Sequence, residues 1–152
     1  MKKIIVIIGI ILLIILFFPC LFIHKMSGNI FVKPMIHDVN IKISFIHSVQ
    51  KTPVEEYLRV ERLGKIILYE THYQSFGVGL PFLLDEGDFH QEGDTFILKM
   101  NREFNDLALR IGKNTQHTLD IDGEILPLYK MLKAGDRIDI SVQPYIIGKL
   151  LN

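Results

Sequence analysis

The most prominent feature of the hydropathy pattern is an uninterrupted apolar run near the N-terminus. Residues 4–23 contain 18 apolar residues in 20, and no ionisable side chain lies between Lys3 and His24. About 20 apolar residues are enough for a helix to cross a hydrocarbon core of roughly 30 Å. The run therefore predicts one N-terminal transmembrane helix, with residues 1–25 as a membrane anchor.

A cleaved signal peptide and a lipidated cysteine are the two alternatives to this anchor. Signal peptides carry a shorter apolar region of about 7–15 residues and small residues at the cleavage site, whereas this run ends Phe17-Phe18-Pro19-Cys20. Lipidation of Cys20 would also need a small preceding residue. The pattern favours an uncleaved anchor.

The charges on either side of the run predict its orientation. The N-terminal amine, Lys2 and Lys3 outnumber Lys25 on the far side, and the flank richer in positive charge stays in the cytoplasm. We expect a single-pass protein of the cell membrane that contacts lipid through residues 4–23. Its N-terminus would be cytoplasmic and its C-terminal domain extracytoplasmic.

After the anchor, the pattern changes to short stretches in which apolar and polar residues alternate. Val39-Asn40-Ile41-Lys42-Ile43-Ser44-Phe45 is the clearest example, and such alternation is typical of half-buried strands. Further strands are expected at residues 54–60, 66–73, 95–100, 107–111, 118–121 and 137–142. Asp122-Gly123 is a strong signal for a two-residue hairpin turn, and residues 126–132 suggest one helical turn.

These elements predict an all-β fold, a small sandwich or barrel of about seven to nine mostly antiparallel strands. Residues 26–37 would form a linker and the first strand, and residues 38–152 the extracytoplasmic β domain. Composition agrees, because residues 26–152 hold 12 Phe or Tyr but only 2 Ala, and aromatic residues favour strands.

Charge and cysteine content exclude some classes of function. Without Lys2, Lys3 and Lys25, 14 basic residues face 17 acidic ones, a formal charge of −3 with no basic cluster. Nucleic-acid binding needs clustered Lys and Arg, so no such partner is expected. One cysteine and scattered histidines predict no metal site and no cofactor.

The first stretch with candidate binding chemistry begins at His47. The alternation places His47 on the apolar face, where a buried imidazole needs a hydrogen-bond partner. Glu55 or Glu56, but not both, is expected to face it across a hairpin. A His–carboxylate pair would suit ligand binding or proton transfer; the alternative is a structural core histidine.

The second stretch runs from Glu70 to Pro81. Gly77 and Gly79 allow a special backbone turn before Pro81, and the exposed amides of such a turn suit a carboxylate or another anion. A simple strand-ending turn or bulge is the alternative. Arg110 has the parity of a solvent-facing residue, although an arginine can also hold a carboxylate.

Catalysis has weaker support from the same residues. Ser48 follows His47 directly and so points to the other face, while Ser75 would meet His47 only through tertiary folding. No nucleophile elbow is present. A small envelope hydrolase using His47, Glu56 and Ser75 remains an alternative function, and a purely structural envelope domain is another.

Together the two stretches resemble the signature of an uncharacterised prokaryotic family, the domain of unknown function 1850. The resemblance covers roughly residues 38–142. The matching positions are His47, Ser48, Thr52, Pro53, Glu56, Tyr73, Ser75, Gly77, Gly79 and Pro81. Members are often encoded beside TRAP transporters of the TAXI class, whose receptors deliver organic anions to a permease. The family supplies no catalytic residues.

We therefore expect a binding or accessory protein of such a transporter. The expected partners are the permease or its solute receptor, and a small organic anion. The candidate ligand- or partner-binding residues are His47, Ser48, Thr52, Glu56, Tyr73, Ser75, Gly77, Gly79 and Arg110.

Overall fold

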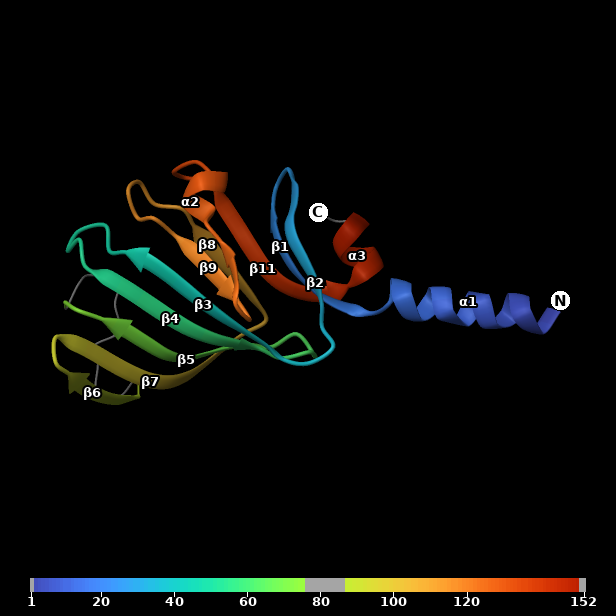
Figure 1. The fold of residues 1–152 in the computed structure, drawn as a ribbon, viewed down its shortest axis with the longest axis horizontal. Helices are drawn as coiled ribbons and strands as arrows, with labels where there is room; N and C mark the ends of the chain where they lie inside the picture. The colour runs from blue at the N-terminus through green and yellow to red at the C-terminus, as the bar shows by residue number, and fades with distance from the viewer. Residues whose placement is uncertain (1, 76–86, 151–152) are drawn as a thin grey trace.

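The computed structural model describes residues 2–75 and 87–150, which form one N-terminal helix followed by two antiparallel sheets (Figure 1). The small sheet has the order β2-β1-β11-β8 and the large sheet the order β10-β9-β3-β4-β5-β7-β6. The small sheet consists of β1 (Pro19–Lys25), β2 (Gly28–Pro34), β8 (Asp106–Arg110) and β11 (Arg137–Pro144). The large sheet consists of β3 (Val39–Ile46), β4 (Pro53–Val60), β5 (Ile66–Tyr73), β6 (Asp88–Glu92), β7 (Thr95–Phe104), β9 (Thr118–Ile121) and β10 (Glu124–Leu126). The helices are α1 (Lys2–Leu16), α2 (Leu128–Met131) and α3 (Tyr145–Leu150).

The predicted β-sandwich architecture is confirmed, with more strands than expected. Eleven strands lie in the described part of the chain, against the seven to nine that alternation predicted. The additional strands are β1, within the predicted anchor, and the short strand β6, whereas β10 is the second strand of the hairpin predicted at Asp122-Gly123. The turn between β9 and β10 has positive φ at both Asp122 (51°) and Gly123 (89°), as a type I′ hairpin requires.

The predicted transmembrane helix is wrong. The helix α1 ends at Leu16 after 15 residues, and within the described residues no helix combines the length and the apolar character needed to cross a membrane. The second part of the apolar run forms β1 instead. Leu21, Phe22 and Ile23 are completely buried there, because β1 lies between β2 and β11. Residues 19–37 therefore belong to the β domain.

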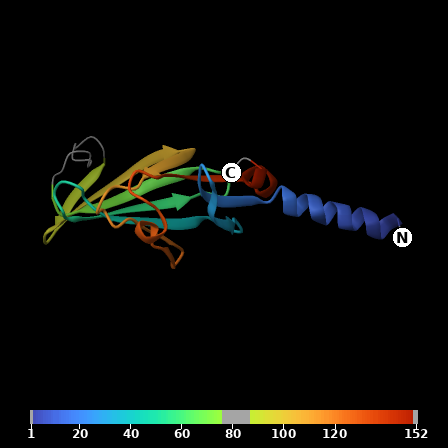
Figure 2. The same cartoon turned by 90° about the horizontal axis from the view of Figure 1, so that it is seen from above.

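Pro19 marks the change from helix to strand. It has no amide hydrogen to continue a helix, and its own carbonyl accepts a hydrogen bond from the Met35 amide at 2.9 Å. An interior strand is apolar on both faces, so its sequence does not differ from that of a buried helix. Figures 1 and 2 both show α1 projecting away from the sheets.

The core lies between the facing surfaces of the two sheets. Its buried members include Leu21 and Ile23 from the small sheet, and Ile41, Leu58 and Leu98 from the large sheet. On the other side of β1, the short helix α3 packs against Phe22. A Cβ atom added to Gly148 would lie 2.2 Å from carbons of the Phe22 ring, so this contact requires glycine.

Candidate functional site

The first piece of the candidate site is the loop that joins β3 to β4. The His47 amide donates to the Thr52 carbonyl at 2.8 Å, and the Lys51 amide donates to the His47 carbonyl at 3.0 Å. Lys51 adopts a left-handed conformation with φ of 59°, which non-glycine residues rarely adopt. Residues 48–51 are exposed, so a firmly closed loop presents its tip to solvent.

His47 supports this loop from within. Its side chain is 7% exposed, and Nδ1 accepts hydrogen bonds from the amides of Val49 (3.3 Å) and Gln50 (3.1 Å). An imidazole nitrogen that accepts carries no proton, so the neutral ring has its proton on Nε2. His47 therefore stabilises the loop through the two backbone hydrogen bonds that its Nδ1 accepts.

The predicted carboxylate partner of His47 does not lie opposite it. Along the β3–β4 ladder, Glu55 pairs with Ser44 and Glu56 pairs with Ile43. The last pair of that ladder is Ile46 with Pro53, so His47 lies beyond the paired region. The cross-strand His–carboxylate pair was wrong in register, because a loop of unknown length cannot fix which residues face each other.

The second piece is Ser75, which follows β5. Its hydroxyl oxygen lies 2.8 Å from the Thr52 hydroxyl oxygen, so a hydrogen bond joins the two stretches that the sequence indicates as candidate binding segments. Ser48 lies on the exposed loop tip. Gly77, Gly79 and Pro81 lie outside the described residues.

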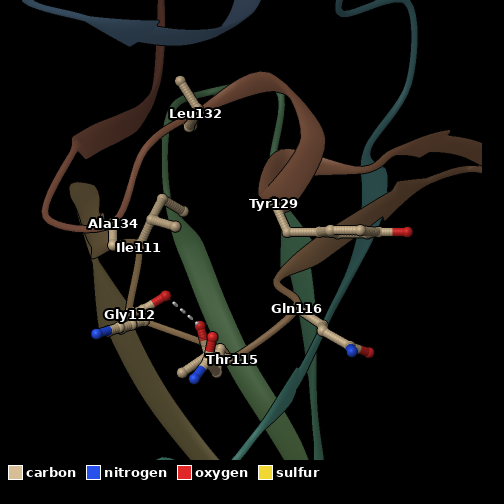
Figure 3. Close-up of a pocket in the computed structure, with 9 residues that line it drawn as sticks. Ile111, Gly112, Thr115, Gln116, Tyr129, Leu132 and Ala134 are labelled. Atoms are coloured by element: carbon tan, nitrogen blue, oxygen red, sulfur yellow. Dashed lines mark hydrogen bonds between the residues drawn. The ribbon is translucent and has the colours of Figure 1, made fainter.

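A third piece, which sequence analysis missed, is the turn at residues 112–116. The Ile46 amide donates to the Thr115 carbonyl at 2.7 Å, which ties this turn to the strand end beside His47. The Thr115 hydroxyl donates to the Gly112 carbonyl at 2.9 Å (Figure 3). No sequence motif predicts the contact between Ile46 and Thr115. It forms because β9, which follows the turn, pairs with β3.

His117 connects the turn at residues 112–116 to β3. Its ring stacks on Phe45 with centroids 5.1 Å apart, and its Nδ1 lies 2.6 Å from the Thr115 hydroxyl oxygen. Because that hydroxyl donates to Gly112, Nδ1–H of His117 donates to Thr115. Burial lowers the pKa of His117.

A surface cavity of about 430 Å³ lies beside this turn. Gly112 and Thr115 line one side, and Tyr129 from α2 lines the side opposite Gly112 (Figure 3). We name the combined edge of the domain the rim: residues 47–52, Ser75 and residues 112–116. It gathers three segments that are far apart in the sequence.

Two other predicted residues are not part of the rim. Tyr73 is a core residue, 1% exposed, and its ring lies 5.6 Å from that of Phe96. Arg110 is exposed on β8 of the small sheet, where its guanidinium donates to the Gly135 carbonyl at 3.0 Å. The prediction that the Arg110 side chain faces solvent is confirmed.

A polar cluster also lies on the outer face of the large sheet. The Lys42 ammonium contacts the Glu55 carboxylate at 3.2 Å, and the Tyr57 hydroxyl donates to the same carboxylate at 2.8 Å. Although burial acts in the opposite direction, these two hydrogen bonds lower the pKa of Glu55. Beside them, His72 Nε2 lies 2.6 Å from a Glu70 oxygen.

The outer cluster is a set of internally paired groups. Burial, together with the Glu55 carboxylate, raises the pKa of the Tyr57 hydroxyl. The arrangement contains no serine or cysteine nucleophile, and in the described part of the chain no group of three potential metal-ligating side chains comes together. It stabilises the sheet surface without an evident reactive group.

Comparison with known proteins identifies one family. Residues 41–128, more than half of the chain, match the model of a family described as a domain of unknown function (DUF1850). The match includes all three segments of the rim. Neither a curated protein nor a solved structure matches the chain. The chain therefore belongs to the DUF1850 family.

Proposed function

We propose that this protein is a binding domain that acts as an accessory of a TRAP transporter of the TAXI class, with the rim docking on the permease or on its solute receptor. The transporter association is what the signature of the family implies. The observation that carries the binding mode is the 2.8 Å contact between the Thr52 and Ser75 hydroxyls, which unites the two stretches of that signature.

The chemistry of the rim suits a protein partner. Val49 is 67% exposed at the loop tip, and Ser48, Gln50 and Lys51 beside it are exposed polar residues. An apolar side chain on a backbone that is already ordered loses little entropy on binding. Such a tip can enter a pocket of a partner without rearrangement.

The same geometry supports binding over catalysis. A triad would need the imidazole of His47 to accept a proton from Ser75 and to be oriented by Glu56. Here Nδ1 accepts from two loop amides, the Ser75 hydroxyl is bonded to Thr52, and Glu56 pairs with Ile43 on the ladder. A serine-reactive probe that labels Ser75 would instead favour the hydrolase alternative.

We further propose that α1 holds the domain at a membrane by inserting into the lipid from one side. Its large apolar side chains from Ile4 to Ile15 are each 51–65% exposed, and such a surface is unfavourable in water. At about 1.5 Å per residue the helix is roughly 22 Å long. The extracytoplasmic placement of the domain stays a prediction.

Affinity purification from detergent-solubilised membranes tests the proposal. The full chain should bring down a permease with several membrane spans or a TAXI-class receptor. Substitution of Val49 by Asp should abolish this, because it places a charge at the centre of the contact. Recovery of neither protein with the wild-type chain would contradict the transporter association.

A further inference from the structure

The end of the domain from which α1 projects carries large apolar side chains that face solvent. They come from three separate segments: the link after α1, the loop between β2 and β3, and the turn between β4 and β5. Phe17, Ile36 and Leu63 in these segments are 59%, 75% and 96% exposed. Single exposed apolar residues are common, whereas a contiguous patch of them marks an interaction site.

Hydrogen bonds hold the three segments together. The Met35 amide donates to the Pro19 carbonyl at 2.9 Å, which ties the β2–β3 loop to the start of β1. The Arg62 amide donates to an Asp38 carboxylate oxygen at 3.0 Å, which ties the β4–β5 turn to the same loop. The Arg62 guanidinium also lies 5.6 Å from the centre of the Phe18 ring. Figures 1 and 2 both show the loop and the turn side by side where α1 joins the domain.

The short helix α3 completes this surface. The Tyr145 amide donates to the Phe18 carbonyl at 2.9 Å, which fixes the start of α3 beside the link. Tyr145 and Ile147 are 36% and 39% exposed. A surface cavity of about 660 Å³ joins the β4–β5 turn to the end of β11, and it is lined by Pro19, Arg62, Leu63, Val142, Gln143 and Pro144. We name the combined surface the base: residues 17–18, 35–38, 62–64 and 145–147.

The attachment of α1 decides what covers the base. Only Phe17 and Phe18 separate the last residue of α1, Leu16, from the first residue of β1, Pro19. Two residues span at most about 7 Å, and the amides of both donate back to carbonyls of α1. A helix α1 that enters lipid therefore brings the base directly against the lipid surface.

We propose that the base seats the domain on the surface of a phospholipid bilayer, with Phe17, Ile36 and Leu63 in contact with lipid. This inference rests on the proposal that α1 enters a membrane, and it adds a second contact that α1 does not make. The other residues of the base suit the same surface. Tyrosine is enriched at the level of the lipid headgroups, and arginine keeps its charge in water while its stem covers apolar surface; Tyr145 and Arg62 provide these two side chains.

Seating of the base also determines where the rim lies. The strand β3 begins beside the base at Val39 and ends at the rim with Ile46. At about 3.3 Å per residue, its eight residues are roughly 26 Å long. The rim is therefore presented to the part of a partner that projects out of the membrane. Because detergent replaces the bilayer, substitutions in the base should not affect the affinity purification of a partner that docks on the rim.

Tryptophan fluorescence tests the seating, because the chain contains no tryptophan and each variant introduces a single one. The full chain with Leu63→Trp, Ile8→Trp or Val49→Trp is reconstituted in phosphatidylcholine vesicles with and without bromine on the acyl chains. Bromine quenches a tryptophan that contacts it. Leu63→Trp in the base and Ile8→Trp in α1 should lose most of their fluorescence in the brominated vesicles. Val49→Trp is the matched control at the rim and should keep its fluorescence.

A second substitution tests whether the base acts as one surface. Ile36→Asp, combined with Leu63→Trp, should reduce the quenching because the new carboxylate has to stay in water. The inference is overturned if Leu63→Trp is quenched no more than Val49→Trp, as it would be if a second copy of the chain covered the base. It is also overturned if Ile36→Asp leaves the quenching unchanged.

The tryptophan in α1 distinguishes failure of this inference from failure of the membrane proposal. Quenching of Ile8→Trp without quenching of Leu63→Trp would overturn the seating of the base and leave the insertion of α1 standing. Absence of quenching at both positions would contradict the insertion and the seating together.

Discussion

The hydroxyl oxygens of Thr52 and Ser75 lie 2.8 Å apart, at the adjoining ends of strands β4 and β5. The two residues are 23 positions apart, and each belongs to one of the stretches that resemble the family signature. Their contact joins the two motifs into one surface. The loop supported by His47 is thereby attached to the segment that follows β5.

This hydrogen bond should appear as an energetic coupling. Thr52→Val and Ser75→Ala should each lower the free energy of unfolding, and the double variant should lose less than the sum because both singles remove the same bond. We expect a coupling of about 1 kcal/mol, measured by urea unfolding of the four proteins. Additive effects of the two substitutions would show that the residues do not interact.

Lys51 allows a test of the left-handed conformation in the loop between β3 and β4. Its φ of 59° favours glycine, so Lys51→Gly should stabilise the fold by about 0.5 kcal/mol after the entropy gained by the unfolded chain is subtracted. Thermal unfolding measures this. Lys51→Ala, which keeps the unfavourable φ, should give no such gain; a Tm lower for Lys51→Gly than for Lys51→Ala would contradict the left-handed conformation.

His117 should make stability depend on pH. The unfolded imidazole titrates near pH 6.5, and burial lowers its pKa in the fold, so the unfolded state takes up the proton first as pH falls. The contribution of His117 is complete above about pH 6.5 and is lost as pH falls towards the lowered pKa. Urea unfolding between pH 7.5 and 5 should show the loss.

The control for this pH effect is His117→Asn, whose amide can still donate to Thr115 but does not titrate. The stability difference between this variant and wild type should shrink or reverse on acidification, because only the wild type loses stability through this residue. Parallel pH profiles of the two proteins would show that His117 does not contribute.

Gly148 tests the packing of α3 on β1. Because an added Cβ would lie 2.2 Å from the buried Phe22 ring, Gly148→Ala should cost about 1–3 kcal/mol through forced displacement. Gly9→Ala is the matched control, since nothing lies within 4 Å of a Cβ at that position in α1. Equal unfolding midpoints for the two variants would mean that α3 is not packed as described.

The N-terminal run shows where sequence reasoning fails. Alternation identified β3 most clearly, because Val39, Ile41 and Ile43 are buried while the residues between them are more exposed. In β1, the consecutive residues Leu21, Phe22 and Ile23 are all buried although they point to alternate faces, because β1 lies between β2 and β11. The length of the apolar run then suggested one helix of 20 residues, although Pro19 lies within that run.

The candidate site was predictable only in part. The stretches around His47 and Ser75 stood out because ordinary strands do not need their polar residues, but the partner of His47 depended on a register that the loop determines. Thr115 joins the rim only through the pairing of β9 with β3.

The most direct test of the rim as a docking surface compares two exposed apolar residues at opposite ends of β4. Val49 lies at the tip of the rim and Leu63 in the turn after β4, with exposures of 67% and 96%. In affinity purification from solubilised membranes, Val49→Asp should lose the permease or receptor while Leu63→Asp retains it. Equal recovery of that partner by both variants would contradict the rim as the docking surface.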